Sequence, residues 1–496
     1  MKFCRLSLFV LIIVSLFTAA ACSEDVKNGE APVITLSGGR IFRVGLGESV
    51  TLSPSFEFLT ESAVIQWILD GNRVGTGPEY TFSASVPGVY YLSLVVSTEW
   101  GSDAIELRFD VYDDTPAPPD TVPLPPADFA GVQFGQREFH VSQGRTIRLM
   151  PFDTDRSQAY RYGWRVDGVS VQESEEPAYC FEAVRQGRFQ VEFTMSLDGA
   201  TLFEDTLQVL VCPPEGTYRR PASAGSSPRL TRVFSFLPAP GQYVNEAYTV
   251  TTMEDACDYA FSLLHEQKLL SLGAFGGSIV VGFDHSIDND GDYNLAVKSL
   301  INSNDSEPGI VWVMQDEDGN GLPDDTWYEL KGSEYGLDCT VSDYAVTYYR
   351  PSGPGRPVSW TDNLGESGTI DYLAGFHKQE TYYPLWVEAD SYTLRGTRLE
   401  ARNRDSGNGT SWILPDYGWG YADNFSETDM LPDRATGISA GSNHFKISDA
   451  VTFDGKAANL QYIDFVRIQT GLNGKSGWLG EISTEVADII DFNLVK

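Results

Sequence analysis

Hydrophobic and polar residues alternate along most of this chain, in short runs that end at glycine or aspartate turns. A period of two is typical of half-buried antiparallel strands. Residues 252–264 instead show helical spacing, with Thr252 as the expected N-cap. Strands are expected after this helix at 277–283, 309–314, 327–331, 344–349, 382–388, 395–402, 463–469 and 486–492. The pattern predicts a mostly β protein.

Residues 33–113 and 128–212 form an internal repeat. A buried tryptophan followed by an Asp-Gly turn occurs in both copies, and a Tyr-x-Phe strand comes after it. A tryptophan in an early strand packs between the two sheets of an immunoglobulin-type sandwich. The repeat therefore predicts two such sandwiches, and the hairpins resemble PKD-like modules. The matching segments are Phe42-Arg43-Val44 with Phe139-His140-Val141, Trp67-x-x-Asp70-Gly71 with Trp164-x-x-Asp167-Gly168, and Tyr80-x-Phe82 with Tyr179-x-Phe181.

The remaining boundaries follow from composition. Proline-rich segments favour an extended strut between domains. After the second sandwich, the chain is too long for another module of that size, and its many strands with long loops predict a larger β-sandwich or jelly roll with one N-terminal helix. We expect a signal peptide at 1–21, a tether at 22–32, linkers at 114–127 and 213–229, and a ligand-binding domain at 230–496.

The N-terminus predicts export. Lys2 and Arg5 precede a short apolar run, which is typical of a secretory signal and too short for a membrane span. Ala19-Ala20-Ala21-Cys22 resembles a bacterial lipobox, and Ser23-Glu24-Asp25 is similar to the acidic export tag of Bacteroidetes lipoproteins. These resemblances imply that Cys22 carries lipid and that the chain is held at the outer face of the outer membrane.

Composition narrows the classes of partner. A formal net charge of −34 repels nucleic acid, so we expect no nucleic-acid partner. The same carboxylates supply many oxygen ligands for hard cations. No CxxC pair is present, which argues against a zinc or redox site. Cys180 and Cys212 lie in one module, and two outcomes stay open for them, a disulfide or two free thiols.

The loop Asp316–Asp325 is the strongest chemical signal. Its oxygen-bearing side chains and its central glycine match the spacing by which an EF-hand-like loop wraps calcium. The expected ligands are Asp316, Asp318, Asn320, the Leu322 carbonyl and Asp324. Position 12 is Trp327, so Asp325 or Glu329 would have to replace the usual bidentate acid. An acidic β-turn without metal is the alternative. Calcium here is expected to be structural.

A second acidic run, Asp288-x-Asp290-x-Asp292 followed by Asn294, is a weaker candidate for calcium. It has alternate carboxylates but no glycine at the sixth position. Asn-Asp-Gly-Asp is also a good hairpin turn. The histidines are weaker candidates for metal ligands still, because they are scattered along the sequence without the spacing of a metal site. They are His265, His285, His377 and His444.

A glycine-rich segment dense in aromatic residues is the candidate ligand site. Such rings suit a flat ligand or a sugar, with polar neighbours fixing its orientation. A small satellite core beneath a long loop is the alternative. The candidate residues are Trp412, Tyr417, Trp419, Tyr421, Asp423 and Asn424.

Three further segments resemble the "cell surface protein" lipoproteins of gut Bacteroidetes. This resemblance implies a surface lipoprotein that captures a nutrient ligand, a corrinoid (cobalamin) first and a glycan next, for a TonB-dependent outer-membrane transporter. A calcium-stiffened adhesin and a glycoside hydrolase are the alternatives. We expect no enzyme, because no Gly-x-Ser-x-Gly, His-Glu-x-x-His or phosphate-binding loop occurs. The segments are 271–285, 307–313 running into 316–325, and Trp478-Leu479-Gly480-Glu481.

Overall fold

The computed structural model describes residues 29–37, 39–112, 134–152, 159–406, 411–431 and 441–496. The expected signal peptide, Cys22 and the linker 114–127 lie outside these residues. The fold is mostly β, as the alternation predicts, and the described part contains one α-helix. No helix among the described residues has the length and apolar character to cross a membrane.

The first module is a two-layered sandwich. Five strands form one sheet in the order β2-β9-β8-β5-β6, with β2 parallel to β9, while β3 pairs with β7. Phe82 of β7 stacks on Phe109 of β9 with ring centroids 3.9 Å apart, which joins the layers. The strands are β1 (Val33–Thr35), β2 (Ile41–Gly45), β3 (Ser49–Leu52), β4 (Ser55–Glu57), β5 (Val64–Leu69), β6 (Asn72–Gly75), β7 (Tyr80–Ser83), β8 (Gly88–Thr98) and β9 (Gly101–Tyr112).

The second module repeats this topology. Its main sheet has the order β10-β16-β15-β12-β13, β10 is parallel to β16, and β11 pairs with β14. Trp67 and Trp164 are fully buried, and their indole N–H groups donate to the carbonyls of Gly77 at 2.8 Å and Pro177 at 3.1 Å. The strands are β10 (Glu138–Ser142), β11 (Thr146–Leu149), β12 (Arg161–Val166), β13 (Val169–Ser174), β14 (Tyr179–Glu182), β15 (Gly187–Leu197) and β16 (Ala200–Cys212).

The C-terminal domain is built on a six-stranded antiparallel sheet, β17-β19-β31-β21-β22-β30. A four-stranded sheet, β25-β24-β23-β26, and a three-stranded sheet, β29-β20-β33, accompany it. The bounds are β17 (Arg232–Leu237), β18 (Leu270–Ser271), β19 (Ser278–Asp288), β20 (Leu295–Lys298), β21 (Gly309–Met314), β22 (Trp327–Leu330), β23 (Val341–Tyr349), β24 (Val358–Asp362), β25 (Ser367–Ile370), β26 (Ser391–Arg398), β27 (Arg404–Asp405), β28 (Trp412–Ile413), β29 (Ser442–Phe445), β30 (Ala450–Val451), β31 (Tyr462–Thr470), β32 (Glu485–Val486) and β33 (Asp488–Asp491).

The helix α2 (Met253–His265) lies where the apolar spacing predicts it. The Thr252 hydroxyl accepts from the Asp255 N–H at 3.1 Å, which is the expected N-cap. Its face of Ala256, Ala260 and Leu264 is buried in the core of the domain.

The expected strand at 382–388 is wrong, because this segment is irregular. Tyr382 and Tyr383 are adjacent and both fully buried, whereas neighbouring residues of a strand point to opposite faces. Their hydroxyls donate to the carbonyls of His377 at 3.0 Å and Ala389 at 2.8 Å. The apolar run therefore reflects a buried loop.

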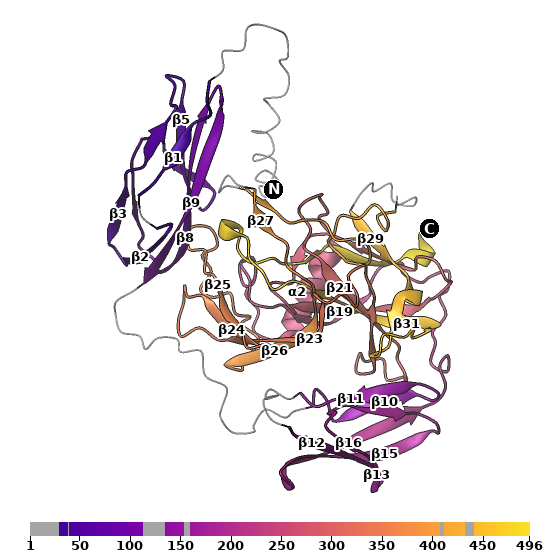
Figure 1. Ribbon diagram of the computed structural model, residues 1–496. Coiled ribbons are helices and arrows are strands. Elements are labelled where there is room, and N and C mark those ends of the chain that lie inside the picture. The colour runs from indigo at the N-terminus through magenta and orange to yellow at the C-terminus, as the bar shows by residue number, and fades with distance from the viewer. Residues whose placement is uncertain (1–28, 38, 113–133, 153–158, 407–410, 432–440) are drawn as a thin grey trace.

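Both modules lie against the C-terminal domain, on different sides of it (Figure 1). The first module docks through β8, where the Val89 N–H donates to the Tyr372 carbonyl at 3.2 Å and the Tyr91 hydroxyl to Asp371 at 3.0 Å. The positions that correspond to Val89 and Tyr91 in the second module are Arg188 and Gln190, and these are exposed. The second module instead docks through β10 and the turn that follows it.

Candidate metal centre

The acidic loop connects β21 to β22 and is shaped by Asp316. Its two carboxylate oxygens accept from the backbone N–H groups of Gly319 at 2.8 Å and Gly321 at 3.1 Å. Both glycines have a positive φ, +77° and +74°, which favours residues without a Cβ atom. The Asp316 N–H donates to buried Asp464 at 2.9 Å. Asp316 thus fixes the turn from inside.

The other predicted oxygen ligands converge on Asn320. Its side-chain amide donates to Asp318 at 3.0 Å and to Asp324 at 3.1 Å. The Asn320 side-chain oxygen accepts from the Leu322 N–H at 2.6 Å, and the Leu322 side chain is 45% exposed. The loop therefore brings Asp318, Asn320 and Asp324 together, as the spacing predicts.

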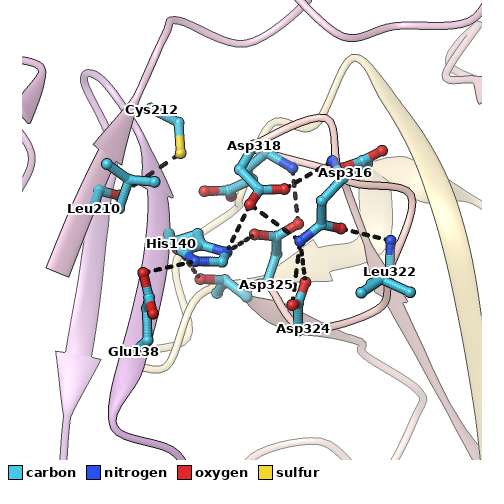
Figure 2. A network of polar contacts seen from close by, with 12 residues as sticks. Glu138, His140, Leu210, Cys212, Asp316, Asp318, Leu322, Asp324 and Asp325 are labelled. Carbon is cyan, nitrogen blue, oxygen red and sulfur yellow. Dashed lines mark hydrogen bonds and ion pairs between the residues drawn. The ribbon is translucent and has the colours of Figure 1, made fainter. Parts of the chain in front are cut away.

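Tertiary structure adds two further side chains to this cluster. One ligand atom each from His140, Asp318, Asp324 and Asp325 lie within 4.8 Å of one another. His140 belongs to β10 of the second module, so the cluster spans two domains (Figure 2). Asp316, expected at position 1, is not a member. Asp325 was one of two substitutes considered for position 12, whereas Glu329 lies elsewhere, where it accepts from the Thr397 hydroxyl at 2.5 Å.

Sequence reasoning missed His140. Its ring Nδ1 lies 3.0 Å from Asp325 and 3.4 Å from Asp318. The one signal for it was the repeat itself, because His140 stands where the first module has the exposed Arg43. A histidine that becomes buried while its counterpart stays exposed indicates a contact that only one module makes.

Buried charged groups dominate the electrostatics where the second module meets the acidic loop of the C-terminal domain. The hydrogen bond with Asp325 raises the pKa of His140 to about 9, against the opposing effect of burial. Burial raises the pKa of Asp316 to about 6 and that of Glu317 to about 8. One Glu317 oxygen accepts from the Ser142 N–H of the second module at 2.5 Å. The other is buried without a hydrogen-bond partner among the described residues.

These residues fit a hard divalent cation. The three carboxylates of Asp318, Asp324 and Asp325 form an oxygen-rich donor set of the kind that calcium takes. The imidazole is a donor more typical of transition metals. In the structure, it serves as the cationic partner of Asp318 and Asp325.

The second acidic run already has basic partners. Asp288 pairs with Arg219 at 2.5 Å, and Asp290 pairs with Lys496 at 2.5 Å. Asn294 donates to Asp290 at 2.6 Å, which closes the turn. Two carboxylates of this run are therefore already paired with cationic side chains.

The aromatic segment is largely packed into the domain. Tyr417 and Tyr421 belong to a buried cluster with Ile310, Leu399 and Leu414, and Trp412 packs against it. Burial raises the pKa of Glu106, a residue of β9 in the first module, and the Trp412 indole lowers it. Trp412 therefore lies at the boundary between the C-terminal domain and the first module. These rings form the satellite core that was the alternative to a ligand platform.

The polar candidates of this segment are also inside. Asp423 accepts from the Glu485 N–H at 2.8 Å, and Asn424 accepts from the Tyr417 N–H at 2.9 Å. Asp423 forms a second cluster of carboxylates with Glu307 and Glu485. Of the six predicted ligand residues, Trp419 alone lines a surface hollow of about 230 Å³.

The four described cysteines outside the N-terminal segment are free. Cys180 is exposed on β14, and Cys212 is buried at the end of β16, so they do not form a disulfide. Burial raises the pKa of the Cys212 thiol to about 12, which makes it unreactive.

Comparison with protein families supports the first module. Residues 31–98 match the PKD-like domain family. Among solved structures, fibronectin(III)-like modules of Clostridium thermocellum CbhA are 15% identical with a TM-score of 0.16, covering 38% of this chain and all of that one. Tandem immunoglobulin domains of titin are 17% identical with a TM-score of 0.13, covering 38% of this chain and 99% of that one. Among curated proteins, none matches the chain.

Proposed function

We propose that this chain is a lipid-anchored surface protein that captures a nutrient ligand, with a calcium ion locking its second module to its C-terminal domain. The observation that carries the proposal is the cluster of Asp318, Asp324 and Asp325, which faces His140 of the second module, with one side-chain atom of each residue within 4.8 Å of the others. The PKD-like match supports a surface or structural protein.

The cation would act on the joint through charge. Asp318, Asp324 and Asp325 repel one another, and a divalent ion bound by oxygen ligands supplies the positive charge that offsets this repulsion. Glu317, the second residue of the loop, accepts from the Ser142 N–H of β10. An ordered loop therefore keeps the second module in register with the sheet of the C-terminal domain.

The modules act as braces in this proposal. Each makes its own polar contacts with the C-terminal domain, Tyr91 with Asp371 in the first and His140 with Asp325 in the second. The proline-rich linkers predicted an extended strut between domains, whereas docked modules hold the C-terminal domain in one orientation. We propose that this domain binds its ligand without catalysis and passes it to a TonB-dependent outer-membrane transporter, with a corrinoid or a glycan as the ligand.

Calorimetric titration with calcium tests the proposal. The mature chain beginning at Ser23, which lacks the lipidated cysteine, is freed of metal with a chelator and titrated with calcium chloride. We expect saturable binding of one ion, abolished in the double variant Asp318→Asn/Asp324→Asn. Asp198→Asn is the matched control, because Asp198 is an exposed turn residue of the second module. Equal binding by the double variant would exclude this loop as the cation site.

A further inference from the structure

The contact between the first module and the C-terminal domain buries a carboxylate of the module. Asp70, in the turn between β5 and β6, is 1% exposed. One of its oxygens accepts from the Tyr91 N–H at 2.8 Å. The other has no hydrogen-bond partner among the described residues. It faces Gly375 of the C-terminal domain, where a Cβ atom would lie 2.1 Å from it. Docking of the module therefore takes this oxygen out of water.

A second carboxylate of the module meets the same domain from β9. One oxygen of Glu106 is buried without a hydrogen-bond partner in the described part of the chain. Burial and the negative charge of Asp405, in β27 of the C-terminal domain, raise the pKa of Glu106 to about 7, while the Trp412 indole lowers it. Glu106 therefore faces a like charge across the joint when both carboxylates are ionised.

The basic side chains closest to this joint serve a different carboxylate, that of Asp371 in the C-terminal domain. Asp371 lies 2.8 Å from the Lys475 ammonium and 4.0 Å from the Arg108 guanidinium. It also accepts from the Tyr91 hydroxyl at 3.0 Å. Asp371 is therefore paired with two cations when the module is docked.

Neither Asp70 nor Glu106 has such a partner. No ion pair within 4.0 Å includes either of them, as far as the described residues go. Lys378 is exposed, and its charge offsets only part of the effect of burial, which raises the pKa of Asp70 to about 6. The other titratable side chains at this turn are tyrosines, which burial keeps protonated: Tyr90, Tyr91 and Tyr372.

The repeat shows that this burial comes from docking and is not a property of the module. Asp167 occupies the turn of Asp70 in the second module, and Thr206 stands where the first module has Glu106. Both are exposed, because the second module docks through β10 instead. The same fold thus leaves both positions in water when this face is not covered.

We infer that docking of the first module on the C-terminal domain is coupled to the uptake of protons by Asp70 and Glu106. A buried carboxylate without a cationic partner is more stable as the neutral acid. The docked arrangement therefore holds these two protons more tightly than the open one, in which both side chains lie in water. Docking is strongest in mildly acidic solution, and it weakens as the pH rises from about 4 to about 7.

Hydrogen exchange of the mature chain from Ser23 measures the opening of this joint. The Val89 N–H donates across it to the Tyr372 carbonyl at 3.2 Å, so its protection reports docking. Exchange is followed from pH 5 to pH 8 and corrected for the intrinsic rate at each pH. We expect the protection of Val89 to fall at least about a hundredfold, since each buried acid contributes about tenfold or more. Leu94, which pairs with both neighbouring strands inside the module, should keep its protection.

Variants identify the groups that take up the protons. Asp70→Asn/Glu106→Gln is expected to keep, at pH 8, the protection that the unmodified chain has at pH 5. Glu106→Gln alone should leave only the part that comes from Asp70, about tenfold. Asp167→Asn/Glu204→Gln is the matched control and should keep the full dependence, because both carboxylates are exposed in the second module.

Three results would overturn the inference. The first is equal protection of Val89 at pH 5 and pH 8, and the second is an undiminished loss of protection in Asp70→Asn/Glu106→Gln. The third is an equal loss at Leu94, which would mean that the whole module unfolds. Failure of calcium to bind would concern only the joint of the second module, which is built from other residues.

Discussion

The imidazole of His140 lies 3.0 Å from the carboxylate of Asp325, although the two residues are 185 positions apart in the chain. This contact joins the second PKD-like module to the acidic loop of the C-terminal domain. The cluster thus combines three carboxylates of the C-terminal domain with an imidazole of the second module.

Calcium is expected to raise the melting temperature of the mature chain. A ligand that binds only the folded state stabilises it by about 2.7 kcal/mol at a hundredfold excess over its Kd. Differential scanning calorimetry with calcium and with a chelator measures the shift. Asp318→Asn/Asp324→Asn should show no shift, whereas a shift as large as that of the unmodified chain would place the ion elsewhere.

Arg145→Met is expected to weaken the docking of the second module. The Arg145 guanidinium lies 2.8 Å from Glu215 and donates to the Ala458 carbonyl at 2.8 Å, and both charged side chains are largely buried. Removing one partner of a buried pair typically costs about 3–5 kcal/mol, because the other charge is left uncompensated.

Thermal unfolding of Arg145→Met and of the double variant Arg145→Met/Glu215→Gln measures this effect. The double variant should recover part of the loss. Arg161→Met is the matched control, since Arg161 in the same module is 54% exposed and lies 4.0 Å from its partner Glu173; its change should stay within about 0.5 kcal/mol. Equal effects of Arg145→Met and Arg161→Met would contradict the prediction.

Asp70→Asn is expected to stabilise the protein above pH 6. Burial raises the pKa of Asp70 from 3.8 to about 6, and one of its oxygens has no hydrogen-bond partner among the described residues. The folded state thus holds this proton more tightly than the unfolded state, so stability falls as the pH rises from about 4 to about 6. Asparagine keeps the oxygen that accepts from the Tyr91 N–H and removes the charge.

The repeat supplies the control for this prediction. Asp167 occupies the same turn in the second module, where its carboxylate accepts from the Gln190 N–H at 3.0 Å, but it is exposed. Chemical denaturation at pH 4 and pH 7.5 should show a gain of about 3 kcal/mol for Asp70→Asn, mainly at the higher pH. Asp167→Asn should be nearly neutral at both. An equal gain for Asp70→Asn at pH 4 would show that charge is not its cause.

Gly375→Ala is expected to displace the first module. A Cβ atom at Gly375 would lie 2.1 Å from the Asp70 carboxylate oxygen and 2.9 Å from its Cγ, and Asp70 is buried at this contact. Hydrogen exchange of residues 371–377 should rise at least tenfold when the contact opens. Gly353→Ala is the control, because a Cβ atom there meets nothing within 4 Å. Unchanged exchange in Gly375→Ala would show that the joint adapts without opening.

The acidic loop Asp316–Asp325 shows how much of a site local spacing can predict. Asp318, Asn320 and Asp324 are separated by a few residues, and the turn that joins them is fixed by Gly319, Gly321 and the carboxylate of Asp316. Spacing in the sequence therefore predicts that these oxygens converge. Asp316 carried the same signal and nevertheless turns inward, where its two oxygens accept from the backbone N–H groups of Gly319 and Gly321.

The aromatic segment shows the opposite case. Tyr417 and Tyr421 have the composition of a ligand platform and also that of a satellite core. Which of the two they form depends on whether Ile310 and Leu399 pack against them, and these residues come from distant parts of the chain. The fate of Trp419 is decided in the same way, by the segments that leave its ring beside a hollow.

The sequence by itself determined the alternation that makes this chain a β protein, the repeat with Trp67 and Trp164, the helix capped by Thr252 and the turn of the acidic loop. Each of these features depends on side chains that are only a few residues apart. What decides it is whether a given side chain prefers water, a hydrophobic core or a hydrogen bond with a backbone N–H group. Only the tertiary structure decided that Asp70 is buried while Asp167 is exposed, and that His140 meets Asp325. Identical local motifs cannot encode that difference, because it arises from the distant surface against which each module packs.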